Sequence, residues 1–223
     1  MKFILLYIGL FIGLTAFSQE TNTSIGFSLS PNYSSVRYPN ANVFSDIDIE
    51  VIQSGTKGEL GLSGNFFFQY ELMDKLFVTW GVGVQNYRYA RELFSEDEVM
   101  SLKSVYSQHY LQLNTSIKYR IVNSLYVRAG MGVDLLAEAR YKLLNSASDD
   151  IQEGKDGANF KEAMLPISFG VGYELKLSER VNLMAEVFGT LVVTDAIVIS
   201  PNLAELQRKP WQLGASIGVI RSF

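Results

Sequence analysis

The chain has no cysteine and a single histidine, His109, among its 223 residues. The absence of cysteine excludes disulfides, thiol catalysis and lipid attachment to an N-terminal cysteine. A zinc site would have to combine one imidazole with carboxylates, which is a poor ligand set. We therefore expect no metal and no cofactor.

Positive charge and long apolar runs are also scarce. The net charge is −4 at pH 7, and the sequence contains neither a basic stripe nor a phosphate-binding glycine loop. These features argue against nucleic acid as a partner. After the N-terminal segment, no apolar run approaches the ~18 residues of a membrane-spanning helix.

The N-terminal segment has the features of a secretory signal peptide. Lys2 supplies a positive charge, residues 3–14 are apolar, and Ala16-Phe17-Ser18 has the small-x-small pattern of a cleavage site. This order of regions is typical of signal peptides. We expect a signal peptide at 1–18 and one mature domain at 19–223, located outside the cytoplasm.

Alternation of apolar and polar residues is abundant. In residues 124–136 every second position is apolar, namely Leu125, Val127, Ala129, Met131, Val133 and Leu135. Successive side chains of a strand point to opposite faces, so the pattern predicts a strand with one apolar and one polar face. It occurs in eight segments, at 24–34, 58–72, 76–91, 106–121, 124–136, 165–175, 181–191 and 211–223.

Short and long connections take turns between these segments. The short ones are 73–75, 122–124 and 177–179, and the long ones lie near 37–57, 92–105, 142–160 and 194–209. Opposite residues of a hairpin point to the same face, which here requires an odd number of loop residues. Three residues satisfy all three turns, and this is a common hairpin length. The alternation predicts an up-and-down order of antiparallel strands.

Two architectures share this pattern: a soluble sandwich or lipocalin-like barrel, and a membrane barrel whose apolar face meets lipid. The polar face is rich in small residues such as Gly81, Gly130, Gly170 and Ser216. Small side chains suit the crowded interior of a narrow barrel. We predict an all-β fold, an eight-stranded antiparallel up-and-down transmembrane β-barrel. It would have short periplasmic turns and long extracellular loops, in the cell outer membrane.

Charged residues on the polar face would lie in the lumen, where a charge needs a partner. The predicted lumen charge network comprises Glu71, Lys118, Arg120, Arg128, Asp134, Glu174 and Glu186. Because Lys118 falls opposite Arg128, we expect Arg128 to pair with Glu174 or Glu71. An interfacial aromatic girdle is expected on the apolar face near the short turns, at Tyr70, Tyr119, Tyr173 and Phe223.

A family resemblance follows from these features. The stretches FVTWGVGV at 77–84, YVRAGMGV at 126–133 and PISFGVGY at 166–173, with the terminal Phe223, carry it. With the short signal and the amphipathic strands, they resemble the PorT-like, "porin family" outer-membrane barrels of Bacteroidetes. The resemblance implies an outer-membrane location. Some members of the wider family belong to secretion and gliding machinery, and the terminal strand resembles the signal read by the barrel assembly machinery.

These motifs reflect the requirements of a β-barrel and contain no signature of an activity. We expect an envelope component, structural or partner- and ligand-binding, that is not an enzyme and has no catalytic residues. Its expected partners are outer-membrane lipid, the barrel assembly machinery during insertion, and an envelope protein bound through the long loops. A small channel or a secretion or gliding barrel is the alternative.

Two further hypotheses concern chemistry. Ser107 and His109 would share the outward face with Glu92, a set of residues that could act as a lipid-modifying serine hydrolase. Carboxylates also cluster in two long loops, at Asp46, Asp48 and Glu50, and at Asp149, Asp150, Glu153 and Asp156. They could bind Ca²⁺, although a solvated acidic loop is the ordinary interpretation.

Overall fold

The computed structural model describes residues 23–37, 56–94, 101–122, 124–145, 151–155, 162–194 and 209–223. The predicted signal peptide and parts of each predicted long loop lie outside these ranges. The described part of the chain has no helix long and apolar enough to span a membrane.

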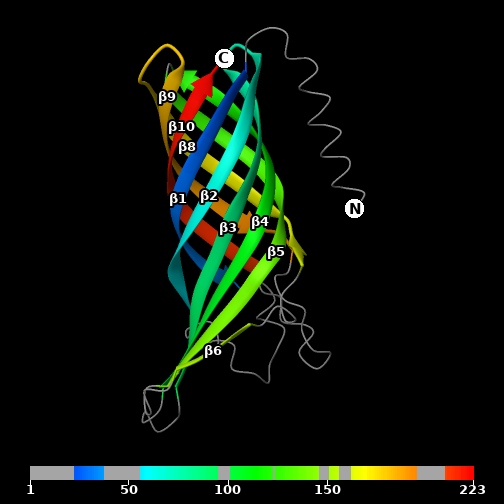
Figure 1. Cartoon of the computed structure of the whole chain (residues 1–223), viewed down its shortest axis with the longest axis vertical. Coiled ribbons are helices and arrows are strands. Elements are labelled where there is room, and N and C mark those ends of the chain that lie inside the picture. The colour runs from blue at the N-terminus through cyan, green and yellow to red at the C-terminus, as the bar shows by residue number, and fades with distance from the viewer. Residues whose placement is uncertain are drawn as a thin grey trace.

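Strands make up almost all of the described chain. They are β1 (Thr23–Arg37), β2 (Thr56–Met73), β3 (Leu76–Phe94), β4 (Ser101–Val122), β5 (Leu125–Asn145), β6 (Ile151–Lys155), β7 (Ala163–Met164), β8 (Pro166–Lys176), β9 (Val181–Val192) and β10 (Lys209–Ser222). Eight of them form a ring in the order β4-β3-β2-β1-β10-β9-β8-β5, which the pairing of β4 with β5 closes (Figure 1). All the pairings are antiparallel. The predicted eight-stranded up-and-down barrel is therefore confirmed.

The outer surface of the ring is apolar. Leu60, Val187 and Ile217 are 70%, 61% and 63% exposed, whereas Gln69, Glu174 and Glu186 on the inner surface are 5–6% exposed. Soluble proteins bury apolar side chains and leave charged ones in water. This chain does the opposite, as a barrel surrounded by lipid must. The faces are those that the alternation predicted.

The short hairpins follow the predicted register at two of three sites. Beyond the first turn Glu71 lies opposite Phe77, and a bulge accompanies the turn. Lys75 takes the left-handed conformation there, with φ 69°, which a three-residue hairpin usually gives to glycine. The third turn differs from the prediction, because Lys176 pairs with Asn182 and five residues separate them. The Ser178 hydroxyl accepts hydrogen bonds from the amides of Arg180 and Val181 and so closes this wider turn.

Three strands on one side of the barrel are longer than predicted. β3 extends to Phe94, β4 begins at Ser101 and β5 extends to Asn145. The added residues lie in stretches predicted as loops. The short strand β6 pairs with β5 there and was not predicted. Figure 1 shows this sheet of β3 to β6 projecting beyond the rest of the barrel at the long-loop end. We call this part the projecting sheet.

The face assignment can be tested at Ala129, an exposed residue of β5 on the apolar outer surface. Ala129→Arg should reduce folding stability in lipid vesicles by about 2–4 kcal/mol, since a charge near the bilayer midplane meets hydrocarbon. Gln152→Arg in β6 adds the same charge to the projecting sheet and should change stability little. Equal loss in urea-induced unfolding of both variants would contradict the assignment.

Candidate functional site

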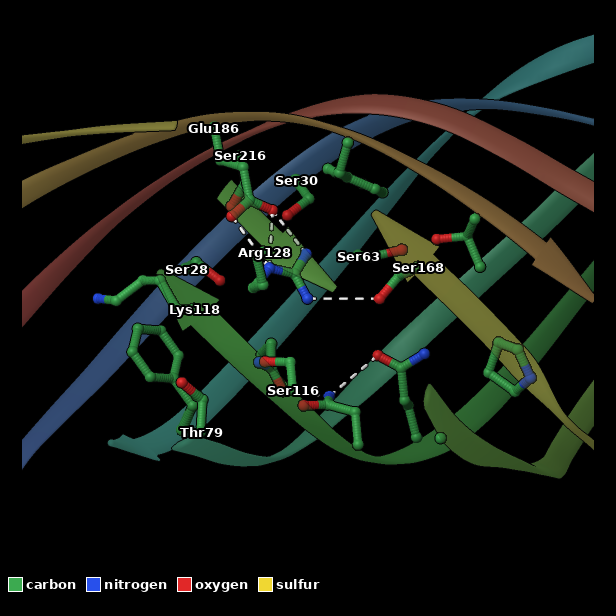
Figure 2. A pocket seen from close by; sticks show the side chains of 18 of the residues that line it. Ser28, Ser30, Ser63, Thr79, Ser116, Lys118, Arg128, Ser168, Glu186 and Ser216 are labelled. Carbon is green, nitrogen blue, oxygen red and sulfur yellow. Dashed lines mark hydrogen bonds and ion pairs between the residues drawn. The ribbon is translucent and has the colours of Figure 1, made fainter. Parts of the chain in front are cut away.

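The inner surface encloses a polar cavity of about 100 Å³. Figure 2 shows hydroxyl groups gathered around it from several strands, including Ser28, Ser30, Ser63, Ser116, Ser168 and Ser216. Small hydroxyl side chains leave room for water and supply its hydrogen-bonding partners. The cavity lies between two layers of larger side chains, one toward each end of the barrel.

Arg128 on β5 pairs with Glu186 on β9, beside the cavity. The guanidinium Nη2 lies 2.5 Å from Glu186 Oε1, and Nε lies 3.0 Å from Oε2. Its Nη1 donates to the Ser168 hydroxyl at 3.4 Å (Figure 2). The Glu186 side chain is 4% exposed and that of Arg128 is 23% exposed. Arg128 thus has a carboxylate partner in the lumen.

The prediction that Arg128 pairs with Glu174 or Glu71 is wrong. β8 lies between β5 and β9, and its Gly170 stands opposite Arg128. A Cβ at Gly170 would lie 2.7 Å from the Glu186 carboxylate. Because glycine leaves that space open, Arg128 and Glu186 meet over the backbone of the intervening strand. Glu71 is half-buried at the short-turn end and belongs to none of the described lumen ion pairs.

Glu174 instead binds the other two lumen cations. Lys118 Nζ lies 2.5 Å from its Oε1, and Arg120 Nη2 lies 3.1 Å from its Oε2. Lys118 also donates to the Gln69 side-chain carbonyl. The Phe77 ring lies close to both cations, with Lys118 Nζ at 4.8 Å and the Arg120 guanidinium at 4.6 Å from its centroid. Both contacts fit cation–π attraction.

An apolar cluster completes this layer. It comprises Phe67, Tyr126, Met184 and Ile220, and Lys118 Nζ lies 5.1 Å from the centroid of the Tyr126 ring. Gly172 makes the layer possible, since a Cβ there would lie 2.3 Å from the Tyr126 hydroxyl. We call these residues, with Lys118, Phe77 and Glu174, the short-turn plug.

Asp134 lies toward the other end and joins no lumen ion pair in the described chain. It is fully buried and accepts hydrogen bonds from the Tyr87 hydroxyl at 2.8 Å and the Gln112 amide at 3.0 Å. The prediction that Asp134 shares one charge network with the arginines is therefore wrong, because its described partners are Tyr87 and Gln112. The second layer contains Tyr87, Tyr110, Met164 and Val192, with Leu136 packed against them. We call it the long-loop plug.

Sequence reasoning missed a set of lumen side chains that bond to the backbone of β3. β2 and β3 lose their regular pairing between Gly58 and Gly64. The Ser34 hydroxyl bonds to both the amide and the carbonyl of Arg88, at 2.6 Å and 2.8 Å. Ser63 accepts from the Asn86 amide at 3.2 Å, and Gln212 donates to the Asn86 carbonyl at 2.8 Å. The glycines of β2 were the available signal, because glycine within a strand often marks a bulge.

The predicted girdle residues lie on the outer surface at the short-turn end. Tyr119, Tyr173 and Phe223 are 47%, 50% and 56% exposed, and Tyr70 is half-buried. The Phe223 amide donates to the Thr23 carbonyl, and Thr23 lies opposite Tyr70. The position of these rings at a membrane interface stays a prediction.

The hypothetical hydrolase residues come together only in part. The Ser107 hydroxyl lies 3.4 Å from His109 Nε2 on the outer surface. The side chain of Glu92 lies outside the described residues, and its backbone pairs with Lys103, well along β4 from His109. Glu138 is the residue opposite His109, but its carboxylate binds Arg140 and Lys155 at 2.7 Å and 3.0 Å.

Of the acidic loop residues, only Glu153 lies within the described chain, where it pairs with Lys142. Within that part of the chain, no group of three or more potential ligands could hold a metal ion.

The lumen pairing predicts the behaviour of Arg128 variants. Arg128→Ala should lower the free energy of unfolding by about 3 kcal/mol, because Glu186 remains buried without a counter-ion. Arg128→Met combined with Glu186→Gln should recover much of that loss. The control, Arg128→Met with Glu174→Gln, should lose further stability because Glu174 binds two other cations. Urea titrations in vesicles measure all three, and equal recovery by both double variants would reject the pairing.

Comparison with curated proteins finds no match. The chain is similar to Neisserial surface protein A (10% identity, TM-score 0.41, covering 89% of this chain and 97% of that one). It is also similar to Ail, the attachment invasion locus protein of Yersinia pestis (12% identity, TM-score 0.37, covering 88% of this chain and 99% of that one). A third similar structure is the outer membrane protein AlkL in lipid bilayers (15% identity, TM-score 0.39, covering 92% of this chain and 92% of that one).

A family model described as an outer membrane protein beta-barrel domain matches residues 17–194. The match covers most of the chain, and the closed ring with its apolar outer surface agrees with it. The protein belongs to this outer-membrane β-barrel family and is located in the outer membrane.

Proposed function

We propose that the protein is a non-conducting, non-enzymatic barrel that presents its long-loop end as a docking surface for another envelope component. The main observation in support of this proposal is that two layers of packed side chains close the lumen. The apolar part of the short-turn plug contains residues from β2, β5, β9 and β10, and its other members come from β3, β4 and β8. The long-loop plug contributes residues from β3, β4, β7 and β9. An open pore would need a continuous water path past both layers.

The projecting sheet supports the docking role. β4 and β5 have 22 and 21 residues, against 11 and 12 in β8 and β9. The extra length carries ordered strand structure beyond the ends of the shorter strands, and Lys142 and Glu153 pair there across β5 and β6 at 3.0 Å. Stacking of Tyr89 on Tyr106, with ring centroids 5.1 Å apart, joins β3 to β4. A rigid surface loses less conformational entropy on binding a partner than a flexible loop does.

The proposal includes two finer points from the sequence. The resemblance of the glycine-containing strands supports the PorT-like type of Bacteroidetes, some of whose relatives serve secretion or gliding machinery. The terminal strand supports recognition by the barrel assembly machinery during insertion. A partner bound at the long-loop end is compatible with both.

The closed lumen predicts that the purified barrel conducts no steady ion current. Planar-bilayer recordings of the wild-type protein should show no stable steps, since both plugs obstruct the path. A wide porin recorded in the same membrane provides the positive control. Stable, uniform steps from the barrel would favour the channel alternative and reject the proposal.

The docking role predicts contact at one end only. A photo-crosslinking residue at Gln152 in β6 should form one discrete protein adduct in intact cells. The same residue at Glu179 in the third short turn is the control, because both positions are exposed. It should not form that adduct. Absence of an adduct from Gln152, or identical adducts from both positions, would contradict docking through the projecting sheet.

A further inference from the structure

Four residues of adjacent strands form one cross-strand row on the outer surface. Arg88 of β3 lies opposite Ser107 of β4, which lies opposite Arg140 of β5, which lies opposite Lys155 of β6. Neighbouring strands are about 4.8 Å apart, so the row extends roughly 14 Å around the barrel. We call it the cationic row. Three of its four members are cations and the fourth carries a hydroxyl.

A bulge in β5 creates this row. His109 pairs with Glu138 while the next residue, Tyr110, pairs with Leu136, so Ala137 is an extra residue. On the N-terminal side of the bulge, the odd-numbered residues Val133 and Leu135 of β5 face outward. After it, Glu138 and Arg140 face outward and Ala139 is 2% exposed. Bulges change the direction of side chains in this way, and the strict alternation would have placed Arg140 inside.

The row has an excess of positive charge. Glu138 binds Arg140 and Lys155, so three cations face one described carboxylate, a surplus of two. The other described ion pairs at this level, Lys142 with Glu153 and Lys103 with Glu59, are each neutral. Arg88 Nε is buried and has no hydrogen-bonding partner within the described chain.

The cationic row lies just beyond the lipid headgroups, within reach of long side chains. The outermost apolar row contains Val84, Leu111 and Leu135. The cationic row lies four residues farther along β3 and β4, about 13 Å along the tilted strand at 3.3 Å per residue. With strands tilted by roughly 40°, this is about 10 Å along the membrane normal. That distance exceeds the ~5–7 Å headgroup layer of one leaflet, so the arginine side chains must reach back toward the membrane.

We propose that the cationic row binds the phosphate group of a lipid in the leaflet at the long-loop end. Arginine binds phosphate through two parallel hydrogen bonds, and the Ser107 hydroxyl between the two arginines can donate a further one. Arg140 and Lys155 are exposed on the outer surface of a barrel surrounded by lipid, and Arg88 and Ser107 are half-buried beside them. This position favours a lipid-borne phosphate over a free one. The inference adds a lipid ligand and does not depend on the docking role.

The experiment compares lipids that differ only in headgroup. The full mature barrel in neutral detergent is titrated with phosphatidic acid or with phosphatidylcholine of the same acyl chains, and bound lipid is counted by native mass spectrometry. Phosphatidic acid should bind about tenfold more tightly, as expected for one or two charged hydrogen bonds. Arg88→Gln with Arg140→Gln should remove this preference, and Lys155→Gln alone should weaken it.

The matched control removes two charges from the other end of the barrel. Lys176→Gln with Arg180→Gln changes exposed residues at the third short turn and should keep the full preference for phosphatidic acid. If the row double variant does not fold, Lys155→Gln still provides the test. Equal binding of the two lipids, or equal loss in the control, would overturn the proposal. Displacement of the lipid by millimolar inorganic phosphate would show a site for free phosphate and would also overturn it.

Discussion

Backbone hydrogen bonding in a medium without water is the constraint on which the rest of this structure depends. Lipid offers no partner for an unpaired amide, so the sheet must close on itself. The pairing of β4 with β5 provides that closure and leaves the barrel wall without an edge. Where β2 and β3 separate, Ser34, Ser63 and Gln212 bond to the backbone of β3 from inside. The polar lumen thus completes the wall as well as filling it.

Charge in the lumen follows a second constraint, because a confined charge must be compensated. Lys118 and Arg128 lie directly opposite each other on β4 and β5. Each has its own carboxylate, Glu174 for Lys118 and Glu186 for Arg128. Glycines on β8 leave the space that both the Arg128 pair and the Tyr126 ring occupy. The same glycines therefore allow charge pairing and dense packing, which together close the lumen.

The outer surface of the barrel is divided along its length. Near the short turns and through the middle it is apolar, as lipid requires. Toward the long loops it becomes charged, and one side continues as the projecting sheet. The bulge at Ala137 coincides with this change of surface. It turns Glu138 and Arg140 outward and keeps Leu136 inward against the long-loop plug. One extra residue thereby serves both the lumen and the outer rim.

The alternation of residues was enough to predict the all-β fold, the strand order and the faces. The reason is that the direction of the side chains alternates with every residue of a strand, and a membrane barrel places apolar side chains outside and polar ones inside. The structure pairs Lys118 and Arg120 with Glu174 and pairs Arg128 with Glu186. Asp134 accepts a hydrogen bond from Tyr87, and Glu71 joins none of the described lumen ion pairs. Bulges break that two-residue repeat, and residue order alone did not reveal them. The partner of Arg128, the outward direction of Arg140 and the wider third turn therefore emerged only from the structure. Each depends on which strands lie next to each other and on one extra or missing residue in their register.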